Sequence, residues 1–163
     1  HPYPQDLNDA KTWNDNKASF NMNTKLVTFK NLEVLSAWAQ KSENKYKKTI
    51  KRSVWLSENG TNSRTYADMY LKEQAAGFAY AWKKLKKLDG IDAMQWHNWI
   101  DHPDEYGLRI GLRKFPNDPD DPMGRKLVWY AYQAAGTSTE DAVFEPYKAV
   151  IGIDNWNIIQ VVQ

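Results

Sequence analysis

The chain has 163 residues, of which 42% are hydrophobic and 26% charged, a composition that suits one globular domain with a real core. Its 22 basic and 20 acidic residues nearly balance, which argues against nucleic acid or an anionic membrane surface as a partner. No apolar run approaches the roughly 20 residues that span a bilayer, and the absence of cysteine excludes disulfides and thiolate chemistry.

Aromatic residues are abundant, with 8 Trp, 9 Tyr and 5 Phe. Flat aromatic side chains fill cores, and they also stack on sugar rings and on bases. Because the charge is balanced, a carbohydrate is a better candidate ligand than a nucleic acid.

The first third of the chain predicts a strand, a loop and a helix. Residues 1–7 read as the end of a strand that is stopped by two prolines. Residues 8–25 are rich in Asn and Asp and lack periodicity, which predicts a long loop of the kind that is more often functional than idle. A helix is expected to begin near Asn31, which is a good N-cap residue.

The remaining elements continue the alternation of strand and helix. Strands are expected near 49–57 and 91–98, and a long helix between them from Thr65 to about Leu88. Two further helices are expected near 125–135 and 140–150. The lysine run on the long helix is interpreted as a solvated face and not as a nucleic-acid site; it comprises Lys83, Lys84, Lys86 and Lys87.

This alternation predicts an α/β fold with parallel strands and right-handed helical crossovers. No glycine-rich phosphate loop follows a strand, so a nucleotide-binding fold has no support. The other common solution is the TIM (β/α)8 barrel, which needs about 250 residues. The three βα units expected here would be the last three of the eight, strands 6 to 8. Residues 1–163 would be the C-terminal portion of a single catalytic barrel domain, with the N-terminal portion absent from this chain.

Polar and aromatic side chains gather where each predicted strand ends. The first strand ends in His1-Pro2-Tyr3, the second in Glu58-Asn59 and the third in Trp96-His97-Asn98-Trp99. Glu is a poor strand residue and costly to bury, so its place after an apolar run suggests a function. In a barrel, catalytic groups come from these carboxyl-terminal strand ends. A carboxylate flanked by His, Tyr and Trp is what glycoside hydrolysis uses.

Three stretches carry a resemblance to known proteins. The motifs "HPYPQDL", "WLSENGTNS" and "QWHNWIDHPDEYGLRIGL" are similar to those of a bacterial family of largely uncharacterised glycoside-hydrolase-like domains, over nearly the whole chain. More broadly, the chain resembles the C-terminal part of a retaining (β/α)8 glycoside hydrolase, of the superfamily that includes cellulases, β-mannanases and β-galactosidases. There the sixth strand often ends in His-x-Tyr, the seventh in the nucleophilic Glu and the eighth in a Trp that lines the sugar site. The matching residues are His1, Tyr3, Glu58 and Trp96.

The resemblance implies a retaining double-displacement mechanism with Glu58 as the nucleophile. The substrate-binding residues are expected to be His1, Tyr3, Asn59, Trp96, His97 and Trp99. The superfamily's acid/base Glu ends the fourth strand, which would precede residue 1, so that residue is expected upstream of this chain.

The same resemblance sets the expected partners. They are an oligo- or polysaccharide substrate and the missing N-terminal part of the barrel, with no nucleic acid, membrane, metal or cofactor. It also favours a secreted or periplasmic protein.

Other functions remain open at this point. A non-catalytic carbohydrate-binding protein would keep the aromatic cleft without the chemistry, and a small α/β interaction domain would leave the strand-end residues unexplained. An N-terminal His can also chelate copper together with a second His, as in lytic polysaccharide monooxygenases. Those enzymes are as a rule disulfide-linked β-sandwiches, whereas this chain alternates β and α and has no Cys.

Position along the elements separates the tryptophans. Trp96 and Trp99 are three residues apart and so face opposite sides of a strand, which leaves at most one to line the site from the strand itself. Four others lie on apolar stripes and are predicted to be core residues: Trp38, Trp55, Trp82 and Trp129.

The loop after the third strand holds His102, Asp101 and Asp104 near His97. These residues could be drawn as a metal site, but their spacing fits no ligand pattern. We interpret them as ordinary loop polarity.

Overall fold

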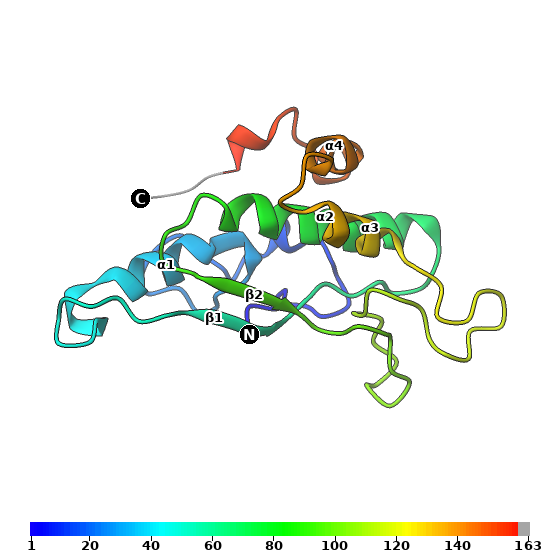
Figure 1. Cartoon of the computed structure of the whole chain (residues 1–163), viewed down its shortest axis with the longest axis horizontal. Helices are drawn as coiled ribbons and strands as arrows, with labels where there is room; N and C mark the ends of the chain where they lie inside the picture. The colour runs from blue at the N-terminus through cyan, green and yellow to red at the C-terminus, as the bar shows by residue number, and fades with distance from the viewer. Residues whose placement is uncertain (160–163) are drawn as a thin grey trace.

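The computed structural model describes residues 1–159, and its centre is a pair of parallel strands (Figure 1). Strand β1 spans Trp55–Asn59 and strand β2 spans Ala93–Trp96. Both strands point the same way, and the N-terminus of the chain lies beside the end of β1. The two strand ends and the first residues therefore share one edge of the molecule.

Within residues 1–159, four α-helices accompany this pair of strands: α1 (Leu32–Gln40), α2 (Asp68–Leu85), α3 (Leu127–Ala134) and α4 (Glu140–Ile151). Four short 3-10 helices lie at Thr12–Asn14, Phe29–Asn31, Ser42–Asn44 and Trp156–Ile158. Helix α2 connects β1 to β2, α3 packs beside α2, and α4 lies over both on the side away from the sheet (Figure 1). Each predicted helix forms, with ends within a few residues of those expected. Among residues 1–159, no helix is both long and apolar enough to cross a membrane.

Helix α2 is the centre of the core because small residues let its neighbours approach closely. Its buried face includes Ala75, Ala76 and Ala79, all fully buried. A Cβ at Gly77 would lie 2.6 Å from Thr61 Cγ2, so only glycine fits where the chain after β1 crosses the helix. One hydrophobic cluster joins α2 to α3 and α4, and a second joins α2 to the strands and to Phe29 and Leu32.

The first predicted strand is not formed. Residues 1–4 have no strand pairing, and the amide of Tyr3 bonds to the carbonyl of His1 within the same segment. The physical reason is that Pro2 and Pro4 have no N–H to donate to a ladder. The described residues thus contain two of the three expected strands, and membership of a (β/α)8 barrel stays a prediction.

Two tryptophans that we predicted to be core residues are exposed. Trp38 is 50% exposed and Trp55 is 62% exposed. Trp55 alternates with Leu56, which packs against the helices, so Trp55 lies on the opposite face of the sheet. For Trp55 the prediction failed because an apolar strand position was equated with burial, and among residues 1–159 no helix covers this face of the sheet (Figure 1).

The lysine run of α2 is also not the solvated face that we predicted. Lys84 is fully buried and paired with Glu33 of α1, and Lys83 bonds to Glu140 of α4 at 2.6 Å. Lys84 follows Ala81 by three residues and Gly77 by seven, and therefore lies on the buried face. Lys86 and Lys87 are exposed, as expected.

Candidate active site

An irregularity in β1 directs Glu58 out of the core. Leu56 pairs with Met94 and Asn59 with Trp96, so β1 has one residue more than β2 over this interval. Leu56 and Asn59 are both buried, whereas the Glu58 side chain is 43% exposed. Such a bulge re-aims a side chain at the end of a strand. Glu58 therefore stands half-exposed where β1 ends.

Asn59 maintains this bulge and does not face the open edge, by which we mean the side of the molecule where residues 1–4, Glu58 and the end of β2 lie. Its Nδ2 donates to the carbonyl of Leu56 at 2.9 Å and to the carbonyl of Gln95 on β2 at 3.1 Å. The side chain is fully buried. The structure thus places Asn59 as a support for Glu58, although the sequence predicted a contact with the sugar.

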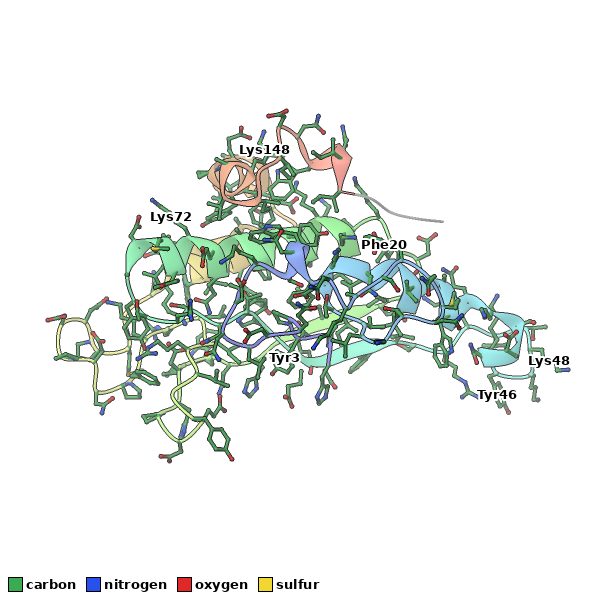
Figure 2. The ribbon with its side chains drawn as sticks, turned by 180° about the vertical axis from the view of Figure 1, so that it is seen from behind. Tyr3, Phe20, Tyr46, Lys48, Lys72 and Lys148 are labelled. Atoms are coloured by element: carbon green, nitrogen blue, oxygen red, sulfur yellow. The ribbon has the colours of Figure 1, made fainter. Side chains whose placement is uncertain are left out.

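Tyr3 and His1 converge on Glu58 from the start of the chain. The Tyr3 hydroxyl donates to Glu58 Oε1 at 3.1 Å, and His1 Nδ1 lies 3.7 Å from the same oxygen. Figure 2 labels Tyr3 beside the strands, far from Tyr46 and Lys48 at the other end of the molecule. Burial, the hydrogen bond to Glu58 and the negative charge of Glu58 raise the pKa of Tyr3. The phenol therefore stays protonated and remains a donor to the carboxylate.

The residues at the end of β2 point in different directions. The Trp96 indole packs between Phe29 and Phe78, and its Nε1 donates to the carbonyl of Ile110 at 2.9 Å. Trp96 is thus partly buried against both hydrophobic clusters, and its ring nitrogen is bonded within the fold. His97, which follows β2, is the residue that adjoins the end of β1: its backbone amide donates to the carbonyl of Asn59 at 2.8 Å, next to Glu58.

Trp99 lies on the loop beyond β2 and is 56% exposed. Its ring meets Trp129 edge-on, with centroids 4.8 Å apart, and its amide bonds to Asn98 Oδ1. Arg113 and Arg125 each lie about 5 Å from the centre of the Trp129 ring. Trp99 is therefore an exposed aromatic surface held by a second indole, as a sugar platform requires.

Glu105 is a site residue that the sequence analysis missed. It lies on the loop after β2, and His97 Nε2 is 3.2 Å from both of its carboxylate oxygens. Asn98 Nδ2 donates to Glu105 Oε1, also at 3.2 Å. The negative charge of Glu105 contributes, with that of Glu58, to raising the pKa of Tyr3. The two carboxylates therefore share one neighbourhood.

Gln74 of α2 ties together the loops that follow the two strands. Its buried Nε2 donates to the carbonyls of Thr61, Arg109 and Ile110 at 2.9, 3.0 and 3.1 Å. At Gly60, a Cβ would lie 2.3 Å from Ile110 Cγ2 and 2.7 Å from the His97 carbonyl. This close approach holds the chain that follows β1 against the backbone of His97.

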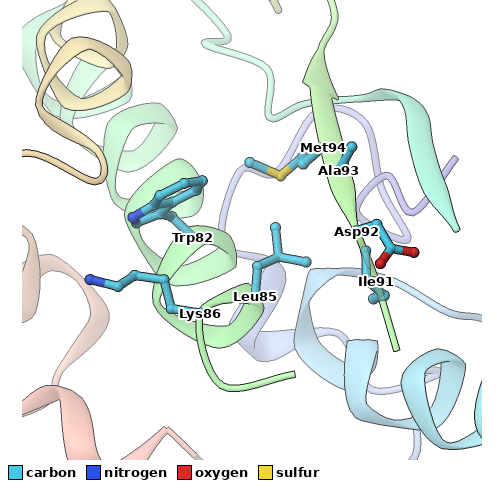
Figure 3. Close-up of a pocket in the computed structure, with 7 residues that line it drawn as sticks. All are labelled: Trp82, Leu85, Lys86, Ile91, Asp92, Ala93 and Met94. Atoms are coloured by element: carbon cyan, nitrogen blue, oxygen red, sulfur yellow. The ribbon is translucent and has the colours of Figure 1, made fainter. Parts of the chain in front are cut away.

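A separate pocket of about 170 Å³ lies between α2 and the first residues of β2 (Figure 3). Its lining is largely apolar, and its two charged residues are engaged elsewhere. Lys86 bonds to Glu140, and Asp92 bonds to Lys51 and to the Val54 amide. The pocket is formed where β2 begins, whereas the half-exposed carboxylates lie where the strands end.

The side chains of the loop residues that could be drawn as a metal site from the sequence do not converge on one point. Asp101 is buried against Lys126, while the exposed His102 lies 3.9 Å from Asp104. Residues 1–159 hold no group of three or more His, Asp or Glu side chains arranged to bind a metal ion.

Comparison with known proteins identifies a family and no function. A family model described as "Family of unknown function (DUF5722)" matches residues 1–159, so the chain belongs to that family. No curated protein and no solved structure matches the chain.

Proposed function

We propose that the strand-end residues are part of the active site of a retaining glycoside hydrolase, with Glu58 as the nucleophile. The observation that carries the proposal is the Tyr3–Glu58 hydrogen bond, which joins residues 55 positions apart at the open edge of the strands. In a retaining mechanism the carboxylate attacks the anomeric carbon, the glycosidic oxygen leaves with a proton from an acid, and water then hydrolyses the glycosyl ester. Tyr3 would orient the attacking carboxylate by donating to one of its oxygens.

The resemblance to barrel hydrolases supports an acid/base carboxyl upstream of residue 1. The two carboxyl groups of a retaining enzyme lie about 5 to 5.5 Å apart. The sheet face that carries Trp55 would then be covered by the other strands of the barrel. On this proposal, residues 1–163 alone are inactive and poorly soluble, because an apolar sheet face and edge stay uncovered.

A non-catalytic carbohydrate-binding protein is the second candidate. The exposed Trp99 indole, supported by Trp129, favours it, because stacking on a sugar needs no carboxylate chemistry. On this alternative, the Glu58→Gln variant would bind sugars as the parent protein does, and neither would turn them over.

Covalent trapping tests the proposal directly. The full polypeptide that contains residues 1–163 is incubated with a panel of 2,4-dinitrophenyl 2-deoxy-2-fluoroglycosides, in which Glu58 would displace dinitrophenolate and keep the fluorosugar as a stable ester. Peptide mass spectrometry should find that ester on the peptide that contains Glu58. A label on another carboxylate would assign the nucleophile elsewhere. No label and no hydrolysis across the panel would favour the binding protein.

A further inference from the structure

The second carboxylate at the open edge, Glu105, has the features of a ligand-binding group. Its side chain is 33% exposed, and its partners are the imidazole of His97 and the amide of Asn98. A carboxylate offers about four acceptor positions, and these two donors leave room for others. Sugar hydroxyls are donors of the kind that would use the remaining positions.

Backbone contacts place Glu105 in the same site as Glu58. The His97 amide bonds to the carbonyl of Asn59, so the imidazole that contacts Glu105 comes from the residue that follows β2 and is bonded to the residue next to Glu58. The loop that carries Glu105 is bound to α2 through the carbonyls that Gln74 holds. Glu105 thus reaches the site from a supported loop.

The charge around these two carboxylates differs from that around the ion-paired carboxylates of the core. Among residues 1–159, neither Glu58 nor Glu105 has a Lys or Arg within ion-pair distance, and their only basic neighbours within that distance are His1 and His97. Several buried carboxylates elsewhere have lysine partners, as Glu140 has Lys83 and Asp101 has Lys126. The site therefore presents two negative charges and no permanent positive charge.

We propose that Glu58 and Glu105 together select a neutral or basic sugar and repel a sugar that carries a carboxylate or sulfate. Glu105 is a substrate-binding residue in this proposal, because it accepts hydrogen bonds from sugar hydroxyls. A negatively charged substituent beside it would face like charge in a partly dry site, where repulsion is stronger than in water. This inference rests on the proposed glycosidase function.

The test compares matched neutral and acidic substrates on the full polypeptide. We would measure kcat/KM for 4-nitrophenyl glucosides and galactosides against the corresponding 4-nitrophenyl glucuronides and galacturonides. The neutral sugars should be preferred at least about tenfold, and added salt should narrow the ratio because it screens the repulsion. Glu105→Gln should narrow the ratio by about tenfold, since it removes one of the two charges at constant size.

Asp104→Asn is the control, because Asp104 is the neighbouring carboxylate on the same loop and its side chain is 91% exposed. It should leave the ratio unchanged, and thermal melting should show that both variants fold. Equal use of acidic and neutral sugars by the parent protein would overturn the inference, as would an unchanged ratio in Glu105→Gln. In both cases the proposed hydrolase function would be unaffected. If no member of the panel were hydrolysed, the proposed function would be contradicted, and so would this inference, which depends on it.

Discussion

The carboxylates in buried ion pairs and those at the strand ends differ in their hydrogen-bond partners and in their exposure to solvent. Glu140 has a 4% exposed side chain and accepts hydrogen bonds from Lys83, Trp82 and the Gly136 amide at 2.6 to 2.7 Å. Glu58, by contrast, is 43% exposed and accepts from Tyr3 at 3.1 Å. Glu140 is therefore paired with lysine and almost shielded from solvent, whereas Glu58 is exposed to solvent and has no lysine partner.

This difference separates charges that hold the fold from charges that are available to a ligand. A buried ion pair repays its desolvation only when its remaining atoms are also bonded, so breaking it is costly. A half-exposed carboxylate contributes little to stability through any one partner, and it keeps lone pairs that can accept hydrogen bonds from a ligand. Substitutions in the buried ion pairs should therefore change stability, and those at the strand ends should change activity. Four predictions test this division, from the largest expected effect to the smallest.

Glu58→Gln should lower turnover of a glycoside substrate by about a thousandfold or more, because it removes the nucleophilic charge at nearly constant volume. The free energy of unfolding should change by no more than about 0.5 kcal/mol, since the side chain is half-exposed. Steady-state kinetics and urea denaturation on the full polypeptide measure the two effects. Retention of full activity would remove Glu58 from the mechanism.

Lys126→Met should lower the free energy of unfolding by about 3 to 5 kcal/mol, because it leaves Asp101 buried without its cation. Lys126 Nζ lies 3.0 Å from both oxygens of Asp101, and both side chains are fully buried. Burial lowers the pKa of Lys126 to about 8, against the attraction of Asp101.

Urea denaturation measures the effect of Lys126→Met, and Lys72→Met is the control, since Lys72 is half-exposed and pairs with Asp68 within one helix. The control should cost less than about 0.5 kcal/mol. A similar loss in both variants would contradict the division.

Acid should destabilise the folded protein through Glu140. Burial by itself would raise the pKa of Glu140, but hydrogen bonds from Lys83, the Gly136 amide and Trp82 outweigh it and lower the pKa to about 2. Because the folded-state pKa is depressed below the ordinary 4.5, the contribution is full above pH 4.5 and is lost as pH falls to about 2. It should amount to about 3 kcal/mol.

The measurement for Glu140 is the free energy of unfolding of the parent and of Glu140→Gln between pH 2 and 6. The variant should be less stable at pH 6, and the two curves should converge as pH falls. Parallel curves over this range would show that Glu140 is not the group responsible.

Tyr3→Phe should lower turnover by about tenfold while the free energy of unfolding changes by about 1 kcal/mol or less, because one hydrogen bond to a half-exposed carboxylate is lost. Tyr106→Phe is the control, since Tyr106 is 99% exposed on the loop after β2. A loss of several kcal/mol of stability in Tyr3→Phe with normal kinetics would make Tyr3 a core residue.

Local sequence patterns predicted the helices, two strands and the open-edge position of Glu58. Periodicity placed α2 within three residues at each end, and the strand-end argument led to Glu58, which lies where β1 ends. His1 and Tyr3 lie beside Glu58 as expected, although the strand predicted to carry them is not formed. These predictions succeeded because helix periodicity and parallel strand ends depend on short stretches of chain.

Contacts formed by loops and by core packing were not predicted. Glu105 was overlooked within a polar loop, because nothing in its own sequence shows that the loop turns back onto His97. Trp96 was assigned to the site, but the direction of its side chain depends on packing against Phe29 and Phe78. Lys84 did carry a signal, its spacing from Ala81, yet its partner Glu33 lies 51 residues away.

The bulge of β1 makes the register of the strand here as important as its composition. Strand side chains alternate, so if the same residues paired with β2 without a bulge, Glu58 would follow Leu56 onto the buried face and Asn59 would turn outward. Asn59 opposes that register, because its buried Nδ2 bonds to the carbonyls of Leu56 and Gln95. A substitution that removed these bonds would favour the regular register, which would turn the carboxylate inward and bury an unpaired charge, so both the fold and the site would suffer.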